Sequence, residues 1–126
     1  MSSIAKTVFA FGLYLLGLGA ILLIVPNLLL GLFQIPSTSE VWIRVVGMLV
    51  FYLGIYYLVA AKTGLRVFML WSARLRPTVL LFFGAFVLAG LAPSVLLIFG
   101  AIDLAGAIWT WNAFRQEAIN RSPHAA

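Results

Sequence analysis

In this chain of 126 residues, 64% are hydrophobic and 9% are charged, which excludes a soluble domain because such domains carry about a quarter charged residues. The absence of cysteine excludes disulfides and thiolate chemistry. A net charge of +5 placed beside apolar runs indicates anionic lipid headgroups rather than nucleic acid as the counter-charge. The sequence therefore predicts a single transmembrane domain over residues 1–126.

The first predicted element is a transmembrane helix over residues 7–25. The segment has no charged residue, and its length of about 20 residues matches a bilayer core. A signal peptide would have a shorter apolar stretch, followed by a small-residue cleavage site. Pro26 is expected to end or kink this helix. Residues 28–33 are too short to span and are expected at the interface or as an extension of the helix.

After a polar loop, a second span is predicted over residues 41–61. Residues 62–76 then form a basic segment with apolar side chains on one helical face, which predicts a short interfacial helix. The alternative is that the apolar part of this segment belongs to an early-starting third span. Its basic side chains are expected to contact anionic lipid headgroups: Lys62, Arg66, Arg74 and Arg76.

A third span is predicted over residues 77–92, because Pro77 suits the first turn of a helix. Pro93 and Ser94 turn the chain into a fourth span over residues 94–115, and His124 lies in the polar tail that follows. The predicted fold class is all-α, an integral membrane four-helix bundle with a short interfacial helix between spans 2 and 3. Small residues predict that the last two spans pack as a hairpin: Ala85 and Ala89 on one helix, Ala101 and Ala105 on the other.

The distribution of basic residues predicts the orientation. With four spans, both termini and residues 62–76 lie on the same side of the membrane. Arg44 is the one basic residue on the opposite side. The positive-inside rule therefore predicts a multi-pass protein of the cell inner (cytoplasmic) membrane with both termini cytoplasmic. The basic residues on the predicted cytoplasmic side are Lys6, Lys62, Arg66, Arg74, Arg76, Arg115 and Arg121.

Asp103 is the acidic residue set inside a predicted span. It lies about 13 Å into a hydrocarbon core of roughly 30 Å, where an aspartate costs about 2.5–3.5 kcal/mol on insertion scales. We therefore expect it to face protein or a water-filled cavity. Gly100, Ala107 and Thr110 share its face and leave room for a neighbouring helix.

Tyr52 and Arg44 on the second span could reach the depth of Asp103. Gly47 and Gly54 would allow the second and fourth spans to meet face to face. The sequence thus predicts a ligand-binding or structural polar site formed by Asp103, Arg44 and Tyr52. A paired or protonated aspartate that only sets the helix register remains the alternative.

Two short patterns resemble a known family. The W-x-R-x-x-G pattern of Trp42, Arg44 and Gly47 and the G-x-x-D pattern of Gly100 and Asp103 resemble the small four-helix bacterial membrane proteins of the DoxX-like group. For some members, the family name implies an association with respiratory or redox membrane complexes.

The spans hold one carboxylate, whereas a metal needs several convergent ligands. We expect no catalytic residue, no metal and no cofactor. The predicted function is a non-enzymatic accessory or assembly subunit, or a binder of a lipophilic small molecule. The alternative is a small-solute transporter that uses Asp103 as its intramembrane charge. The expected partners are the lipid bilayer and no nucleic acid, with a membrane protein partner or a homo-oligomer left open.

Overall fold

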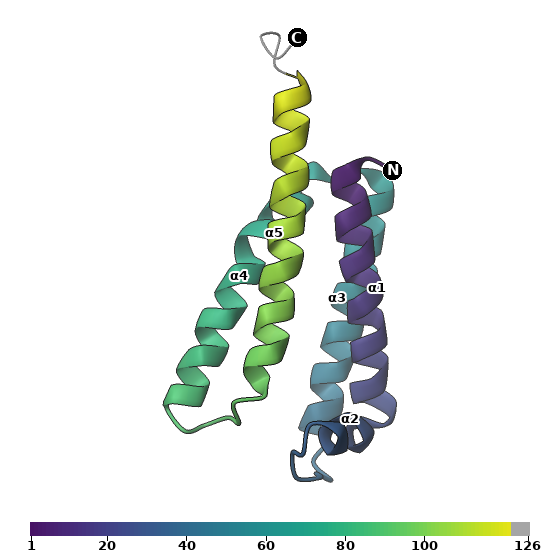
Figure 1. The fold of residues 1–126 in the computed structure, drawn as a ribbon. Coiled ribbons are helices and arrows are strands. Elements are labelled where there is room, and N and C mark those ends of the chain that lie inside the picture. Colours follow the sequence, from purple (N-terminus) through teal and green to yellow (C-terminus); the bar gives the residue numbers. More distant parts are fainter. Residues whose placement is uncertain (122–126) are drawn as a thin grey trace.

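The computed structural model describes residues 1–121, and its regular elements over that range are all α-helices. They are α1 (Ser3–Ile24), α2 (Pro26–Leu32), α3 (Trp42–Thr63), α4 (Arg66–Leu88) and α5 (Leu96–Arg121). The four long helices, α1, α3, α4 and α5, are each long and apolar enough to cross a membrane. His124 lies outside the described residues. The N-terminus, the end of α5 and the α3–α4 connection lie at one end of the molecule, which we call the terminal end (Figure 1).

α1 and α3 form an antiparallel pair held together by glycines, and this pair makes the most extensive contact between any two helices of residues 1–121. A Cβ atom on Gly47 would lie 2.8 Å from the carbonyl carbon of Leu22 and 2.9 Å from the Gly19 oxygen. One on Gly12 would lie 3.2 Å from the Gly54 oxygen. Gly47 and Gly54 therefore allow the close approach of α1. The prediction that they allow the close approach of the fourth span is wrong.

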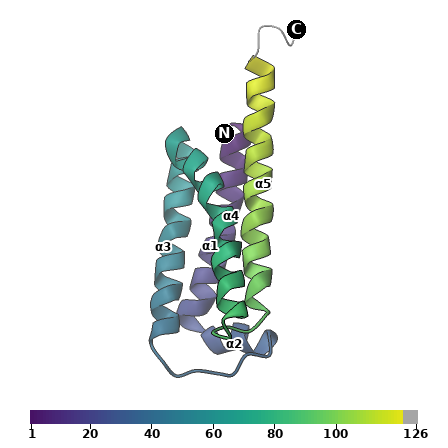
Figure 2. The ribbon, with the colours of Figure 1, turned by 90° about the vertical axis from the view of Figure 1, so that its left-hand side faces the viewer.

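α4 and α5 form the second antiparallel pair (Figure 2). Leu80 packs on Gly100, where a Cβ atom would lie 3.0 Å from the Leu80 Cα atom. The predicted hairpin is therefore present, but the predicted contact face is wrong, because the small residues expected there are exposed. The contact face of α5 carries buried Gly100, Ala107 and Thr110 instead, and the exposed alanines lie off it. Those alanines are Ala85, Ala89, Ala101 and Ala105.

The structure has one continuous helix where a separate interfacial helix followed by a third span was predicted. Lys62 belongs to the last turn of α3, Gly64 ends that helix in a left-handed conformation (φ +68°), and α4 runs from Arg66 through Pro77. The early-starting third span, considered above as the alternative, describes this arrangement. The first turns of α4 run obliquely from the end of α3 before the helix turns along α5 (Figures 1 and 2).

A side chain of α5 compensates for Pro77 inside α4. Proline lacks the backbone N–H that would bond the carbonyl four residues earlier, which here belongs to Ala73. Trp111 Nε1 donates a hydrogen bond to that Ala73 oxygen at 3.0 Å. The Ala73 carbonyl is therefore not left unpaired by the proline. Backbone groups of a membrane span must be paired within the protein, because lipid offers no hydrogen-bond donors.

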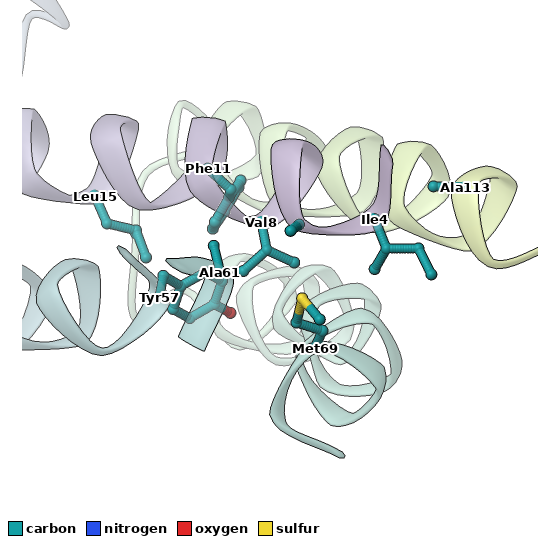
Figure 3. Packing of buried hydrophobic residues seen from close by; sticks show 9 residues of the cluster. Ile4, Val8, Phe11, Leu15, Tyr57, Ala61, Met69 and Ala113 are labelled. Atoms are coloured by element: carbon teal, nitrogen blue, oxygen red, sulfur yellow. The ribbon is translucent and has the colours of Figure 1, made fainter. Parts of the chain in front are cut away.

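The hydrophobic core occupies the half of the bundle toward the terminal end. α1 is central to it, and Figure 3 shows its side chains reaching toward α3 and α4. Beyond this core, toward α2, the two helix pairs diverge (Figure 1). The buried cluster comprises Ile4, Ala5, Val8, Phe11 and Leu15 of α1, Tyr57 and Ala61 of α3, Met69 of α4 and Ala113 of α5.

The ends of the other helices follow the sequence closely. α1 ends at Ile24 and α2 starts at Pro26, so the predicted break at this proline is confirmed. α1 begins at Ser3 because the Ser2 hydroxyl caps it, accepting a hydrogen bond from Ala5 N at 3.1 Å. α5 extends to Arg121, beyond the predicted end of the fourth span.

Candidate functional site

A cavity of about 690 Å³ lies between the α1/α3 pair and the α4/α5 pair. All five helices line it, together with Phe33 and Ile35 of the α2–α3 connection. Its volume falls within the range of small-molecule sites, about 300–1,000 Å³. Most of its wall is aliphatic or aromatic, and the wall toward α2 is entirely so. Hydroxyl and charged groups come from Tyr14, Tyr57, Ser72, Arg76 and Asp103.

Arg76 is the buried charge of this cavity, with 4% of its surface exposed. Its Nε donates to the Ser72 carbonyl oxygen at 3.1 Å, and its Nη2 donates to Thr110 Oγ1 at 2.8 Å. Its Nη1 is buried and has no hydrogen-bond partner in residues 1–121. The guanidinium also lies 4.5 Å from the centre of the Phe11 ring, a cation–π distance. Nη1 therefore lies within the helix packing and not on the open surface of the cavity.

The Arg76 guanidinium is anchored by a chain of hydroxyl groups. Thr110 Oγ1, which accepts from Arg76, lies 2.8 Å from Thr7 Oγ1, and the Thr7 hydroxyl also lies 2.7 Å from the Ile4 carbonyl oxygen. Thr7 and Thr110 are both almost fully buried. This chain ties α4 to α5 and α1, so it holds the arginine in one position.

Asp103 lines the same cavity. Asp103 and Arg76 form neither a hydrogen bond nor a salt bridge with each other, and Asp103 has no hydrogen-bond partner within residues 1–121. Gly106, between Asp103 and Thr110 on α5, leaves room for the arginine. A Cβ atom there would lie 3.0 Å from Arg76 Nη1 and 2.8 Å from Phe11 Cδ2.

The structure does not bring together the three residues of the predicted site. Arg44 Nη1 donates to the carbonyl oxygens of Leu23 and Ile24, at 2.6 and 3.0 Å. These carbonyls end α1 before Pro26 and lack intrahelical partners. Tyr52 is 51% exposed on the outer face of α3. Since α3 packs on α1 and not on α5, neither side chain reaches Asp103.

Aromatic side chains close the cavity toward the terminal end. The ring of Tyr57 lies 5.6 Å from that of Phe11 and 5.2 Å from that of Phe68, which it meets edge to face. Tyr57 is only 5% exposed. These three rings line the cavity at its end toward the hydrophobic core.

The cavity has an opening between α3 and α4. Its lining residues Val46 and Leu53 on α3 are 49% and 42% exposed, and Trp71 and Leu75 on α4 are 51% and 58% exposed. They border the cavity and the outer surface at once. Because both helices are candidate spans, this opening faces the lipid.

The burial of Arg76 corrects its predicted role as a headgroup contact. Lys62, Arg66 and Arg74 are exposed. The prediction for Arg76 rested on its charge and on those of its neighbours in residues 62–76. The signal was in the spacing: Met69, Ser72, Ala73 and Arg76 lie at i, i+3, i+4 and i+7, so the arginine shares a face with small residues.

Comparison of the chain with protein-family models, with curated proteins and with solved structures found no match. No group of three or more histidine, cysteine, aspartate or glutamate side chains in residues 1–121 could hold a metal ion. The chemistry of the site therefore rests on the cavity, Arg76 and Asp103.

Proposed function

We propose that this protein is a non-enzymatic membrane protein that binds a lipophilic small molecule in the cavity between its two helix pairs. The observation that carries this proposal is a cavity of about 690 Å³ whose wall is largely apolar and also holds a few polar side chains, Arg76 and Asp103 among them. Such a wall can hold the hydrocarbon part of a ligand, while the few polar side chains orient its polar part.

The opening between α3 and α4 supports entry from the bilayer. Trp71 and Leu75 at its rim are apolar and half exposed, so a lipophilic molecule can pass without crossing water. An accessory or assembly role remains compatible with such binding.

We also propose that the terminal end is cytoplasmic, in the inner membrane. Both described ends of the chain and the α3–α4 connection lie there (Figure 1), with exposed Lys62, Arg66 and Arg74. An excess of basic residues marks the cytoplasmic side. These three exposed side chains are the proposed contacts to anionic lipid headgroups. The DoxX-like resemblance stays a prediction.

The second candidate is a transporter of small solutes that uses Asp103. The hydroxyl chain from Arg76 through Thr110 and Thr7 supplies polar groups toward the terminal end. Toward the opposite end, the cavity wall consists of apolar side chains such as Leu29, Leu96 and Phe99. A solute path needs polar groups in both directions, so the arrangement favours binding.

Native mass spectrometry of the protein, purified in a mild detergent, tests the proposed function. We expect a lipophilic molecule to copurify with the wild type. Val79 lines the cavity one turn from Arg76, so Val79→Trp should fill the space and remove the copurifying molecule. Val59→Trp is the matched control, because Val59 is 54% exposed and does not line the cavity.

Equal amounts of bound molecules in wild type, Val79→Trp and Val59→Trp would contradict the proposal. The thermal unfolding temperature of each variant shows whether it is folded. If Val79→Trp does not fold, displacement of the copurified molecule by 1-oleoylglycerol added to the wild type replaces that comparison.

A further inference from the structure

We infer that the cavity holds one extended hydrocarbon chain of about 16 to 18 carbons, and that α2 and the contact between Phe33 and Phe99 set this length limit. This inference rests on the proposed function and gives the size and shape of the ligand. Single-chain lipids such as monoacylglycerols belong to this class, and two-chain membrane lipids do not.

The volume of the cavity fits a single chain. A methylene group occupies about as much space as a water molecule, roughly 30 Å³, so a cavity of about 690 Å³ holds at most about 23 such groups. A two-chain membrane lipid has two acyl chains and a glycerol backbone, which together contain more groups than that. The cavity therefore excludes the lipids that form the bilayer itself.

The open surface of the cavity wall is mainly hydrocarbon. Of its five polar or charged side chains, Tyr57, Ser72 and Arg76 are buried, with no more than 7% of their surface exposed. Tyr14 and Asp103 are half-buried. Most of the surface that a ligand can touch is thus aliphatic or aromatic, which suits an alkyl chain.

The lining residues give the cavity an elongated shape. On α3 they run from Ile43 to Tyr57, about 21 Å at 1.5 Å per residue. An extended chain advances about 1.25 Å per carbon, because carbon–carbon bonds of about 1.5 Å meet at tetrahedral angles. The cavity is therefore as long as a chain of about 16 to 18 carbons.

Both ends of the cavity are bounded by side chains. Toward the terminal end, Phe11 and Tyr57 belong both to the cavity wall and to the buried core. Toward the opposite end, α2 lies across the end of the bundle (Figures 1 and 2), with buried Leu30 in the wall. The rings of Phe33 and Phe99 meet there edge to face at 5.2 Å. A longer chain can extend only through the opening between α3 and α4, where it returns to the lipid.

Native mass spectrometry with saturated 1-monoacylglycerols of 10, 12, 14, 16, 18 and 20 carbons tests this inference, because these probes share one head group. We expect the wild type in a mild detergent to bind the 16- or 18-carbon probe most tightly, at least tenfold more tightly than the 10-carbon probe. Shorter chains leave empty space in the cavity, which costs free energy in proportion to its volume. The 20-carbon probe should bind no more tightly than the best shorter one.

Phe33→Ala should move the boundary at the α2 end. The space freed by the ring takes about three methylene groups at roughly 30 Å³ each, so the preferred chain should become at least two carbons longer. Phe99→Ala removes the other ring of the same contact and should shift the preference in the same direction. Phe82→Ala is the matched control, because Phe82 is 62% exposed and does not line the cavity. Its preference should remain that of the wild type.

Three results with the wild type alone would overturn the inference: equal affinity for all six probes, an affinity that still rises at 20 carbons, or tighter binding of 1,2-dipalmitoylglycerol than of 1-palmitoylglycerol. An unchanged preference in folded Phe33→Ala and Phe99→Ala would overturn the assignment of the length limit. If Val79→Trp still removed the bound probes in these cases, the proposed function would stand. If no probe bound the wild type, or if Val79→Trp bound every probe as well as the wild type does, both would fail.

Discussion

The two helix pairs of this protein are built differently. In the α1/α3 pair, Gly12 and Gly19 face Gly54 and Gly47, so the backbones lie close along much of their length. In the α4/α5 pair, side chains make the contact: Leu80 packs on Gly100, and Trp111 bonds the carbonyl freed by Pro77. The first pair carries no charged residue on the cavity wall, whereas the second carries both Arg76 and Asp103.

This difference indicates a division of roles. Close glycine packing leaves little freedom to shift, because a backbone contact cannot be repacked as a side chain can. The α1/α3 pair therefore acts as a rigid wall without charged side chains. The α4/α5 pair holds the charged groups of the cavity wall and supplies, through α4, one side of the opening to the lipid.

The largest expected effect is from alanine at the glycine contacts. Gly47→Ala would place its Cβ against the backbone of Leu22, so we expect a loss of about 1–3 kcal/mol, the usual cost of overpacking. Gly100→Ala meets the end of a Leu80 side chain as well as its Cα and should cost less. Thermal unfolding in a mild detergent measures both changes.

Gly17 is the control, because a Cβ atom there meets nothing within 4 Å. Gly17→Ala should be neutral or stabilising by up to about 1 kcal/mol, since alanine favours a helix. If Gly100→Ala lowered the unfolding temperature more than Gly47→Ala, the contrast between the two pairs would be wrong.

The second prediction concerns the hydroxyl chain that anchors Arg76. Thr110→Val removes the acceptor of Arg76 Nη2 and the partner of Thr7, so we expect a loss of about 1–3 kcal/mol from unpaired buried groups. Thr110→Ser keeps the hydroxyl and should be much milder. Thr63→Val, at an exposed position on α3, is the control. Equal unfolding temperatures for Thr110→Val and Thr110→Ser would show that the chain does not stabilise the fold.

Much of the fold follows from the sequence, because apolar runs bounded by prolines and polar loops identify four spans regardless of their partners. The site does not follow, because it depends on which helices pair. Gly47 and Gly54 signal a close neighbour but do not say which one. Arg44 was predicted to pair with Asp103 from its depth in the membrane alone. In the structure it donates instead to the carbonyl oxygens at the end of α1.

The third prediction tests how α5 compensates for the proline of α4. Trp111→Phe leaves the Ala73 carbonyl unpaired, so it should cost about 0.5–1.5 kcal/mol. In a Pro77→Ala background the helix regains an N–H for that carbonyl, so the same change should cost less. Trp109→Phe, at a residue that is 52% exposed, controls for the loss of an indole. Identical costs of Trp111→Phe in both backgrounds would contradict this explanation.

The smallest expected effect is at Ala105, which the sequence placed in the helix contact and the structure places on the exposed surface. Ala105→Leu should change the free energy of unfolding by no more than about 0.5 kcal/mol. Ala107→Leu is its matched counterpart, because Ala107 is 0% exposed, and it should be clearly destabilising. If Ala105→Leu destabilised the protein more than Ala107→Leu, the contact face predicted from the sequence would be the correct one.

Photolabelling in lipid nanodiscs tests the binding cavity most directly. The probe is a monoacylglycerol with a diazirine in its acyl chain, and mass spectrometry locates the label with and without excess 1-oleoylglycerol. Val50, Val79 and Phe99 line the cavity, whereas Leu81 and Leu88 are 73% and 91% exposed on the outer surface of α4. The account predicts labelling of the three cavity residues that the competitor abolishes, and labelling of the two outer leucines that it leaves unchanged. Cavity residues that remain unlabelled, or that label without competition, would contradict it.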